Sequence, residues 1–340
     1  MHSDIAAPTT GQEPGQHEPG QYKYWAYRIA AAVVPLIPLP IAQALAQAIG
    51  VCLWAVMPAA RRRADFNLRH IPELAQDEDR RRWAVRGVFR HLALNYLDLF
   101  RAGRFSTSRV LADWTIENQE LFTSALAQGR GVILISAHLG NFEYAAVRLA
   151  SMGVPLILPA ERLKPERLFT LASALRGHHG IHVVPADSTE AVRDLFAALR
   201  RGEVVLLAVD RDVLGTGVEV PLFGAPVRLP IGGVLLAQRS GAPVLWAHGW
   251  RESNGRARGA FLPVDQPADQ ADEPVGDLHG VTTRTRTRPR GKEALALALA
   301  PIAALLERQI AAHPEQWVAA LTTMWQMPAA DHEGGPDPDT

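Results

Sequence analysis

Residues 131–146, "GVILISAHLGNFEYAA", place a histidine and an acid where the chain is expected to change from strand to helix. An apolar run with the character of a buried strand leads to His138, and Glu143 follows five positions later. A carboxylate that reaches back across this turn hydrogen-bonds one imidazole nitrogen and leaves the other to act as a base. Such a base takes a proton from a substrate hydroxyl while the oxygen attacks an acyl carbon. The spacing alone also fits a structural histidine at the end of a strand.

The elements around this pair alternate between strand and helix. Apolar runs predict strands at 131–136, 154–160, 180–186, 203–209 and 242–248, and amphipathic spacing predicts helices at 142–152, 165–176, 188–200 and 232–239. This alternation is typical of an α/β fold with a mostly parallel layered sheet flanked by helices. Ligands of such sheets bind at the carboxyl ends of the strands, which is where His138 stands. Backbone amides at the start of the next helix are expected to stabilise a developing oxyanion.

Several blocks carry a resemblance to a known family. "GRGVILISAHLGNFEYAA" resembles the first signature block of the lysophospholipid acyltransferase superfamily, and more narrowly the H-x4-[DE] motif of its lipid A late acyltransferase and phosphatidylinositol mannoside acyltransferase branch. Three further segments follow in the family's order, namely "ILPAERLKPERLFTLASALRGHHGIHVVP", "VVLLAVDRDVLGTGVEVPLFGAPVRLPIGGVLLAQRSGAPVLW" and "HPEQWVAALTTMW". The likeness runs from about residue 22 to 327, which is nearly the whole chain between its tails.

The resemblance implies roles for particular residues. His138 is the general base and Glu143 its partner, while Glu219 matches a downstream acid proposed to support the histidine in the mannoside group. The residues expected to bind substrate are Arg162, Arg176, Asp210, Arg211 and Arg228. No metal or prosthetic group is implied, because acyl-CoA or acyl carrier protein enters as a co-substrate.

Some of these residues have simpler interpretations. Arg162 also fits a surface ion pair with Glu161 or Glu166, and Glu219 fits an ordinary strand residue. Arg228 fits equally well a solvated residue in a turn.

The N-terminal region is apolar enough to contact a membrane. Residues 29–60 contain no charge, and prolines at positions 35, 38 and 40 interrupt the run. Because proline removes helix hydrogen bonds, we expect a hairpin of two apolar helices, near 23–36 and 40–58. One tilted span from Ile41 to Met57 is the alternative, and a buried helical layer of a soluble protein is another. The basic segment "ARRRADFNLRH" follows and favours the inner, cytoplasmic face of the cytoplasmic membrane.

Composition limits the classes of protein to which the chain can belong. Lys and Arg total 35, as do Asp and Glu, so the chain lacks the basic excess expected of a nucleic-acid-binding protein. The single cysteine, Cys52, excludes an internal disulfide. We expect a disordered tail at 1–21, membrane-associated helices at 22–60, an acyltransferase domain at 61–328 and a second tail at 329–340. Inside the domain, helices are predicted at 77–102 and 293–312, with a loop at 265–293.

The expected function follows mainly from the resemblance. The chain should move a fatty acyl group from acyl-CoA or acyl carrier protein to a hydroxyl of a membrane glycolipid, like a phosphatidylinositol mannoside or a lipid A precursor. A lysophospholipid acyltransferase, an acyl-thioester hydrolase and a non-enzymatic lipid-binding protein remain alternatives. No G-x-S-x-G elbow, P-loop or H-E-x-x-H motif occurs in the sequence.

Overall fold

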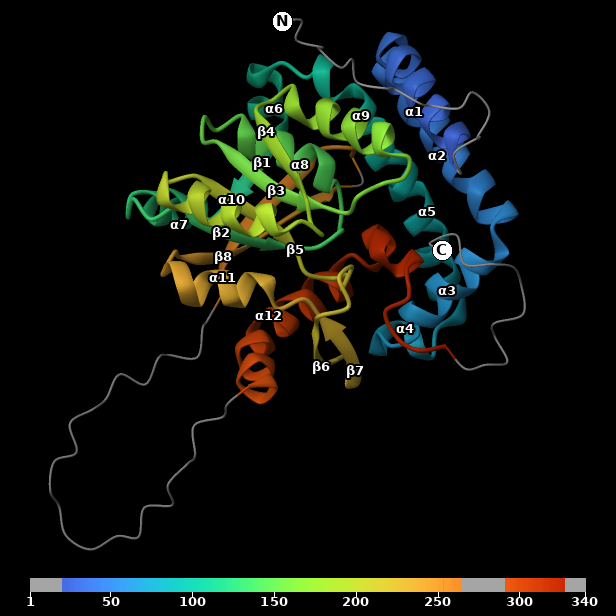
Figure 1. Ribbon diagram of the computed structural model, residues 1–340. Coiled ribbons are helices and arrows are strands. Elements are labelled where there is room, and N and C mark those ends of the chain that lie inside the picture. Colours follow the sequence, from blue (N-terminus) through green and yellow to red (C-terminus); the bar gives the residue numbers. More distant parts are fainter. Residues whose placement is uncertain (1–19, 253, 265–290, 328–340) are drawn as a thin grey trace, which may run out of the picture.

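The computed structural model describes residues 20–252, 254–264 and 291–327 of the chain (Figure 1). Apart from residues 20, 21 and 291–293, the two predicted tails and the predicted loop at 265–293 lie outside these described residues.

A seven-stranded sheet forms the centre of the fold. Its strand order is β1-β9-β8-β2-β5-β3-β4. The strands are β1 (Trp114–Glu117), β2 (Val132–Ser136), β3 (Leu156–Ala160), β4 (Ile181–Pro185), β5 (Val204–Ala208), β8 (Val244–Arg251) and β9 (Ala257–Pro263). Neighbouring strands are parallel except β8 and β9, which are antiparallel. The predicted, mostly parallel sheet is therefore confirmed, while β1 and β9 were not predicted because they lack long apolar runs.

Helices cover both faces of this sheet. Alternate residues of β2 point to opposite faces, so Ile133 and Ile135 join one apolar core and Val132 and Leu134 join the other. The first core includes residues of α10 (Thr189–Arg200), α11 (Gly232–Ser240) and α12 (Lys292–Ala312). The second includes residues of α6 (Thr107–Asp113), α7 (Gln119–Leu126) and α8 (Phe142–Ala150). In Figure 1, α8 and α12 accordingly lie on opposite sides of the sheet.

The predicted N-terminal helices are present as α1 (Gln21–Val33), the short 3-10 turn η1 (Val34–Leu36) and α2 (Leu39–Val56). Helix α2 packs along α5 (Glu78–Arg101), and Gly50 allows the close approach because a Cβ there would lie 2.6 Å from the Cα of Arg90. Large apolar side chains of α1, η1 and α2 are exposed, including Tyr22, Trp25, Ile29, Val33, Leu36, Ile41, Leu45, Ile49 and Val56. These helices are therefore not the buried layer of the alternative prediction.

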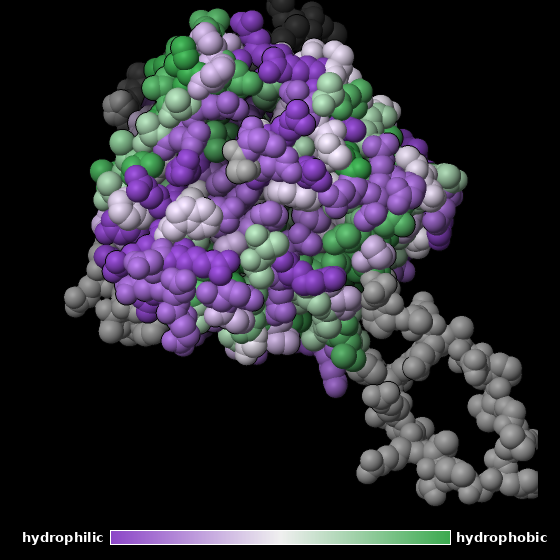
Figure 2. Space-filling model, turned by 180° about the vertical axis from the view of Figure 1, so that it is seen from behind, coloured by the Kyte–Doolittle hydropathy of each residue, from purple (hydrophilic) through white to green (hydrophobic). Residues whose placement is uncertain are grey.

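Two helices are long and apolar enough to cross a membrane by length and composition, α2 and α12. Only 17% of the α2 segment is buried, whereas 39% of the α12 segment is. Helix α12 packs its apolar face on the sheet core, which is the behaviour of a core helix. The view from behind in Figure 2 is dominated by hydrophilic residues over most of its area.

The remaining elements surround this frame. They are α3 (Pro58–Leu68), α4 (Pro72–Ala75), η2 (Ala102–Arg104), α9 (Glu166–Gly177), β6 (Val218–Leu222), β7 (Ala225–Leu229), η3 (Pro314–Gln316) and η4 (Val318–Leu321). Strands β6 and β7 form a separate antiparallel hairpin that packs on α12. Its two turn residues, Phe223 and Gly224, both have positive φ, as tight hairpin turns require.

Candidate active site

The end of β2 delivers His138 to a tightly held turn. Gly140 has φ +67°, and a Cβ at this position would overlap the carbonyl oxygen of Gly249, so only glycine fits. The segment that follows α12 holds this turn through two backbone hydrogen bonds. Val318 N–H donates to the carbonyl of His138 at 2.9 Å, and Gly140 N–H donates to the carbonyl of Gln316 at 3.0 Å. These backbone hydrogen bonds fix the position of the His138 imidazole.

Asp210 is the hydrogen-bond partner of this imidazole. Its Oδ1 accepts from Nδ1 of His138 at 2.8 Å, and its Oδ2 accepts from the backbone N–H of His138 at 2.8 Å. The sheet register explains the contact, because Ser136 of β2 pairs with Ala208 of β5. His138 and Asp210 each stand two residues further along these parallel strands, so they leave the sheet side by side.

The surroundings of Asp210 keep it ionised. Its side chain is completely buried, and Nε1–H of Trp317 donates to its Oδ2 at 3.1 Å. Burial alone would raise the pKa of Asp210, but the neighbouring imidazole and the hydrogen bonds from His138 and Trp317 outweigh it and hold the pKa below its ordinary value. An ionised carboxylate only accepts hydrogen bonds, so Nδ1 carries the proton and Nε2 is left as the basic nitrogen.

The carboxylate of Glu143 has another partner than the imidazole that the sequence suggested. Its carboxylate receives a two-pronged ion pair from Arg176 of α9, with Nε of Arg176 to Oε2 at 3.0 Å. Both side chains are largely buried. The imidazole contact predicted for Glu143 is made instead by Asp210, at Nδ1, because Asp210 follows the strand beside β2 while Glu143 pairs with Arg176 of α9. A catalytic role for Glu143 stays a prediction.

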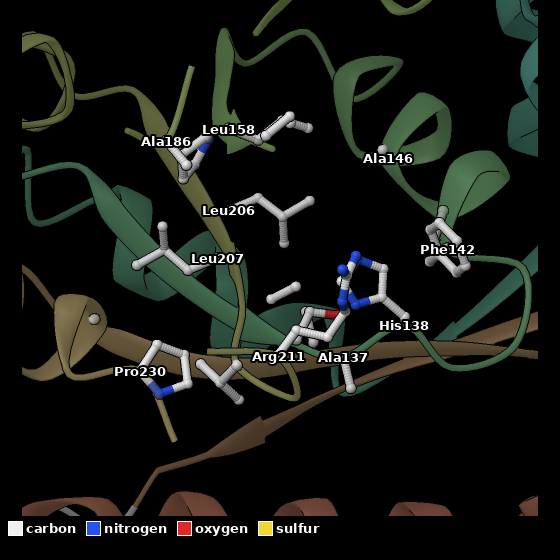
Figure 3. Close-up of a pocket in the computed structure, with 18 of the residues that line it drawn as sticks. Ala137, His138, Phe142, Ala146, Leu158, Ala186, Leu206, Leu207, Arg211 and Pro230 are labelled. Carbon is white, nitrogen blue, oxygen red and sulfur yellow. The ribbon is translucent and has the colours of Figure 1, made fainter. Parts of the chain in front are cut away.

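A cavity of about 690 Å³ opens beside His138 (Figure 3). The side chain of His138 is 31% exposed, and the ring of Phe142 meets it edge-on at 5.2 Å between centroids. Across the cavity lie apolar residues from neighbouring strands, among them Leu158, Leu206 and Leu207. This volume and lining are typical of a site for a largely apolar ligand with a few polar groups at one place.

The other predicted residues divide into two groups. Arg176 and Arg211 line the cavity, and Arg211 forms an ion pair with Glu161 at 3.0 Å. Asp210 lies beneath His138 and is not among the described residues that line the cavity. The expectation that Asp210 faces substrate is therefore corrected to a contact with the imidazole.

The second group lies outside the cavity lining in the described part of the chain. Arg162 pairs with Glu166 at 2.8 Å and with Asp187 at 3.2 Å, close to its alternative interpretation as a surface ion pair.

Glu219 and Arg228 stand opposite each other on the exposed side of the β6–β7 hairpin, where the alternation of the strands directs both side chains to solvent. Arg228 also pairs with Asp212 at 3.4 Å. The residues described as lining the cavity include Asp212 but neither member of this hairpin pair.

Two contributors to the site received no role from the sequence. Trp317 donates to the buried carboxylate of Asp210, and Asn95 of α5 donates to the carbonyl of Gly140 at 2.7 Å. The block "HPEQWVAALTTMW" carried the only signal for Trp317, through its resemblance to the family's closing segment. Nothing in the sequence around Asn95 indicated its contact.

Comparison with known proteins identifies relatives of this chain. The phosphatidylinositol mannoside acyltransferase of Mycobacterium tuberculosis (strain ATCC 25618 / H37Rv) is 32% identical over 234 residues, which are 68% of this chain and 64% of that protein. The protein of the same name from Mycolicibacterium smegmatis is 28% identical over 200 residues, or 58% of this chain and 64% of that protein. The chain thus matches 64% of the length of each of these curated relatives, which is slightly less than two thirds.

The family itself is matched over almost the whole chain. Residues 10–325 match the family described as bacterial lipid A biosynthesis acyltransferase. This range contains His138, Asp210, Trp317 and every strand of the sheet. The chain belongs to the bacterial lipid A biosynthesis acyltransferase family.

Proposed function

We propose that the protein is a membrane-associated O-acyltransferase that moves a fatty acyl group from an acyl thioester to a hydroxyl of a membrane glycolipid. The observation that carries the proposal is His138, bonded through Nδ1 to a buried, ionised Asp210 and standing beside a largely apolar cavity. The names of the relatives favour an acceptor like a phosphatidylinositol mannoside over one like a lipid A precursor.

The reaction requires one proton to be moved twice. Nε2 of His138 takes the proton of the acceptor hydroxyl, and the oxygen attacks the thioester carbonyl to form a tetrahedral intermediate. The carbon–sulfur bond then breaks, and the imidazolium returns the proton to the departing thiolate. Asp210 stabilises the imidazolium through Nδ1–H and holds the ring in one tautomer. No covalent intermediate on the protein is needed.

Charged residues at the cavity suit an anionic head group. Arg211 lies three residues beyond the end of β5 and is paired with Glu161, an exposed side chain that an anionic substrate group can replace. Arg176 donates to both carboxylate oxygens of Glu143 and is largely buried. We therefore assign head-group binding to Arg211 and a shaping role in the cavity wall to the Glu143–Arg176 pair.

The direct test uses the purified full chain with radiolabelled palmitoyl-CoA and three acceptors in parallel: a phosphatidylinositol mannoside, a lipid A precursor and a lysophospholipid. We expect label to enter the mannoside lipid, as followed by thin-layer chromatography. Release of free fatty acid alone would identify a hydrolase. No consumption of thioester with any acceptor would overturn the assignment as an enzyme.

Membrane association is the second part of the proposal. Helices α1 and α2 expose large apolar side chains next to a basic segment, a combination that suits the interface of an anionic leaflet. Tyr22 and Trp25 belong to the residue types that gather at membrane interfaces. The basic segment at 60–70 favours the cytoplasmic face.

Placing aspartate at Ile41, Leu45 and Ile49 together should release the protein from membranes. These exposed residues recur every four positions along α2 and so share one face of the helix. Each substitution removes about 1.5 kcal/mol or more of the free energy gained by burying an apolar side chain in the membrane. Partitioning into vesicles should therefore weaken at least about 100-fold in a sedimentation assay.

Leu111→Asp on α6 provides the matched control, since it is an equally large exposed apolar residue far from α2 in sequence. It should leave partitioning unchanged. A wild-type protein that fails to sediment with vesicles would contradict membrane association, and a triple variant that still sediments with them would contradict the role of this face of α2.

A further inference from the structure

A second cavity lies at the C-terminal end of α2, between α3 and the first turns of α5. Its volume is about 320 Å³, and none of the described residues that line it also lines the cavity beside His138. In Figure 1, α3 lies at the right of the view below α2, whereas α10 and α11 lie at the left. This cavity is therefore separate from the active site and adjoins the helices that we propose to contact the membrane.

Positive charge exceeds negative charge in its lining. Four arginines and two acids line the cavity, namely Arg61, Arg62, Asp65, Arg69, Glu78 and Arg82. One of the two acids is already neutralised from behind, because Nε of Arg81 donates to Oδ1 of Asp65 at 2.9 Å. Arg81 is itself 6% exposed. The lining is thus complementary to an anion.

Arg61 is held in position without an acidic partner in the described part of the chain. Its guanidinium lies over the indole ring of Trp54, 5.2 Å from the ring centroid. Its Nη1 donates to the backbone carbonyl of Trp54 at 3.2 Å. These contacts orient the guanidinium and leave most of its N–H donors for a ligand.

The other ion pairs of the cavity lie at its exposed rim. Nη2 of Arg82 lies 2.7 Å from Oε1 of Glu78, and both side chains are exposed. Arg69, also exposed, pairs with Asp65 at 2.6 Å. Exposed ion pairs contribute little to stability, so a phosphate group can replace the carboxylate partner of such an arginine at little cost.

The rest of the lining is apolar and consists of Trp54, Phe66, Val85 and Met327. Guanidinium groups bind phosphate through paired, charge-assisted hydrogen bonds. Apolar side chains in the same cavity favour contact with a hydrocarbon group of the ligand. The ligand that suits this cavity therefore carries a phosphate anion beside an apolar part.

We propose that the cavity binds the phosphate group of an anionic membrane phospholipid that takes no part in acyl transfer. Helix α2 ends at the exposed residue Val56, and α3, which carries Arg61 and Arg62, begins two residues later. Arginines that directly follow an apolar, membrane-facing helix lie at the level of the lipid head groups, where anionic lipids attract them. A phospholipid bound here holds the end of α2 at the membrane surface.

Native mass spectrometry of the full chain in a nonionic detergent tests this by counting the phospholipids bound to each protein molecule. We expect one phosphatidylglycerol to bind at least about 10-fold more tightly than phosphatidylcholine, because the choline cation of the latter is repelled by the arginines. Arg61→Gln and Arg82→Gln should each weaken the binding of phosphatidylglycerol at least about 10-fold, the effect of losing a hydrogen bond between charged groups.

Arg80→Gln is the matched control. Arg80 is an exposed arginine of α5 that does not line the cavity, so its replacement removes the same charge from the same helix. Phosphatidylglycerol should bind to this variant as tightly as to the wild type, and circular dichroism checks that each variant is folded. The measurement requires no turnover, so its outcome is independent of whether the protein transfers acyl groups.

Equal binding of phosphatidylglycerol and phosphatidylcholine by the wild type would overturn the inference, as would wild-type affinity in a folded Arg61→Gln protein. Displacement of phosphatidylglycerol by an equal concentration of inorganic phosphate would identify a site for a soluble anion instead of a lipid. A specific adduct that forms only after Asp331, Glu333, Asp337 and Asp339 are replaced by amides would assign the cavity to this acidic segment of the chain.

Discussion

His138→Ala should lower the rate of acyl transfer by at least about 100-fold, the lower end of what a positioned general base contributes. The reason is that Nε2 of His138 is the group assigned to remove the proton of the acceptor hydroxyl, and Asp210 is buried too deeply to replace it. The measurement is kcat/KM for release of CoA in the presence of the glycolipid acceptor, in purified protein.

A matched control for this variant is His182→Ala. His182 is an exposed histidine in β4, away from the turn at the end of β2. It should retain wild-type turnover, and both variants should show wild-type circular dichroism. Equal turnover in the wild type and in His138→Ala would remove His138 from the reaction.

Asp210→Asn should reduce turnover by about 100- to 10,000-fold, the range spanned by a general base and by loss of the acid that orients it. An asparagine amide at this position presents an N–H donor toward Nδ1 and so favours the tautomer that protonates Nε2, which is then no longer a base. The assay is again kcat/KM for CoA release.

Glu143→Gln distinguishes between the two acids. Because Glu143 binds Arg176 in the structure, we expect Glu143→Gln to lose less activity than Asp210→Asn. The reverse order would restore the pairing of His138 with Glu143 that the H-x4-E spacing suggested.

The stability of Asp210→Asn relative to the wild type should also depend on pH. The pKa of Asp210 is lowered in the folded protein, so its ionised form stabilises the fold at pH values above the ordinary carboxyl pKa of about 3.9. That contribution is lost as the pH falls through the lower folded pKa. Urea unfolding of both proteins should therefore show a difference in unfolding free energy that is constant near neutral pH and shrinks below about pH 4.

The local sequence was sufficient for much of the fold. Apolar runs and amphipathic spacing predicted β2, β3, β4, β5 and β8 and the helices between them, because each of these elements is specified by a pattern within the segment itself. The uncharged stretch with its prolines predicted α1 and α2 for the same reason. The H-x4-E block also put His138 at the carboxyl end of a strand, where the structure has it.

Partners across the fold were decided by the tertiary structure alone. Asp210 meets His138 because β2 and β5 are neighbours in a particular register, and no local pattern states which strands are adjacent. Glu143 of α8 pairs with Arg176 of α9, 33 residues further along the chain, and Trp317 donates to Asp210 across 107 residues.

The sequence by itself therefore determined five of the seven strands of the sheet, the helices between them, the family resemblance and the position of the base, all of which depend on residues close together in the chain. The tertiary structure decided which acid contacts that base and that Glu219 and Arg228 face solvent. These outcomes depend on strand order and helix packing, which bring together residues that are far apart in sequence.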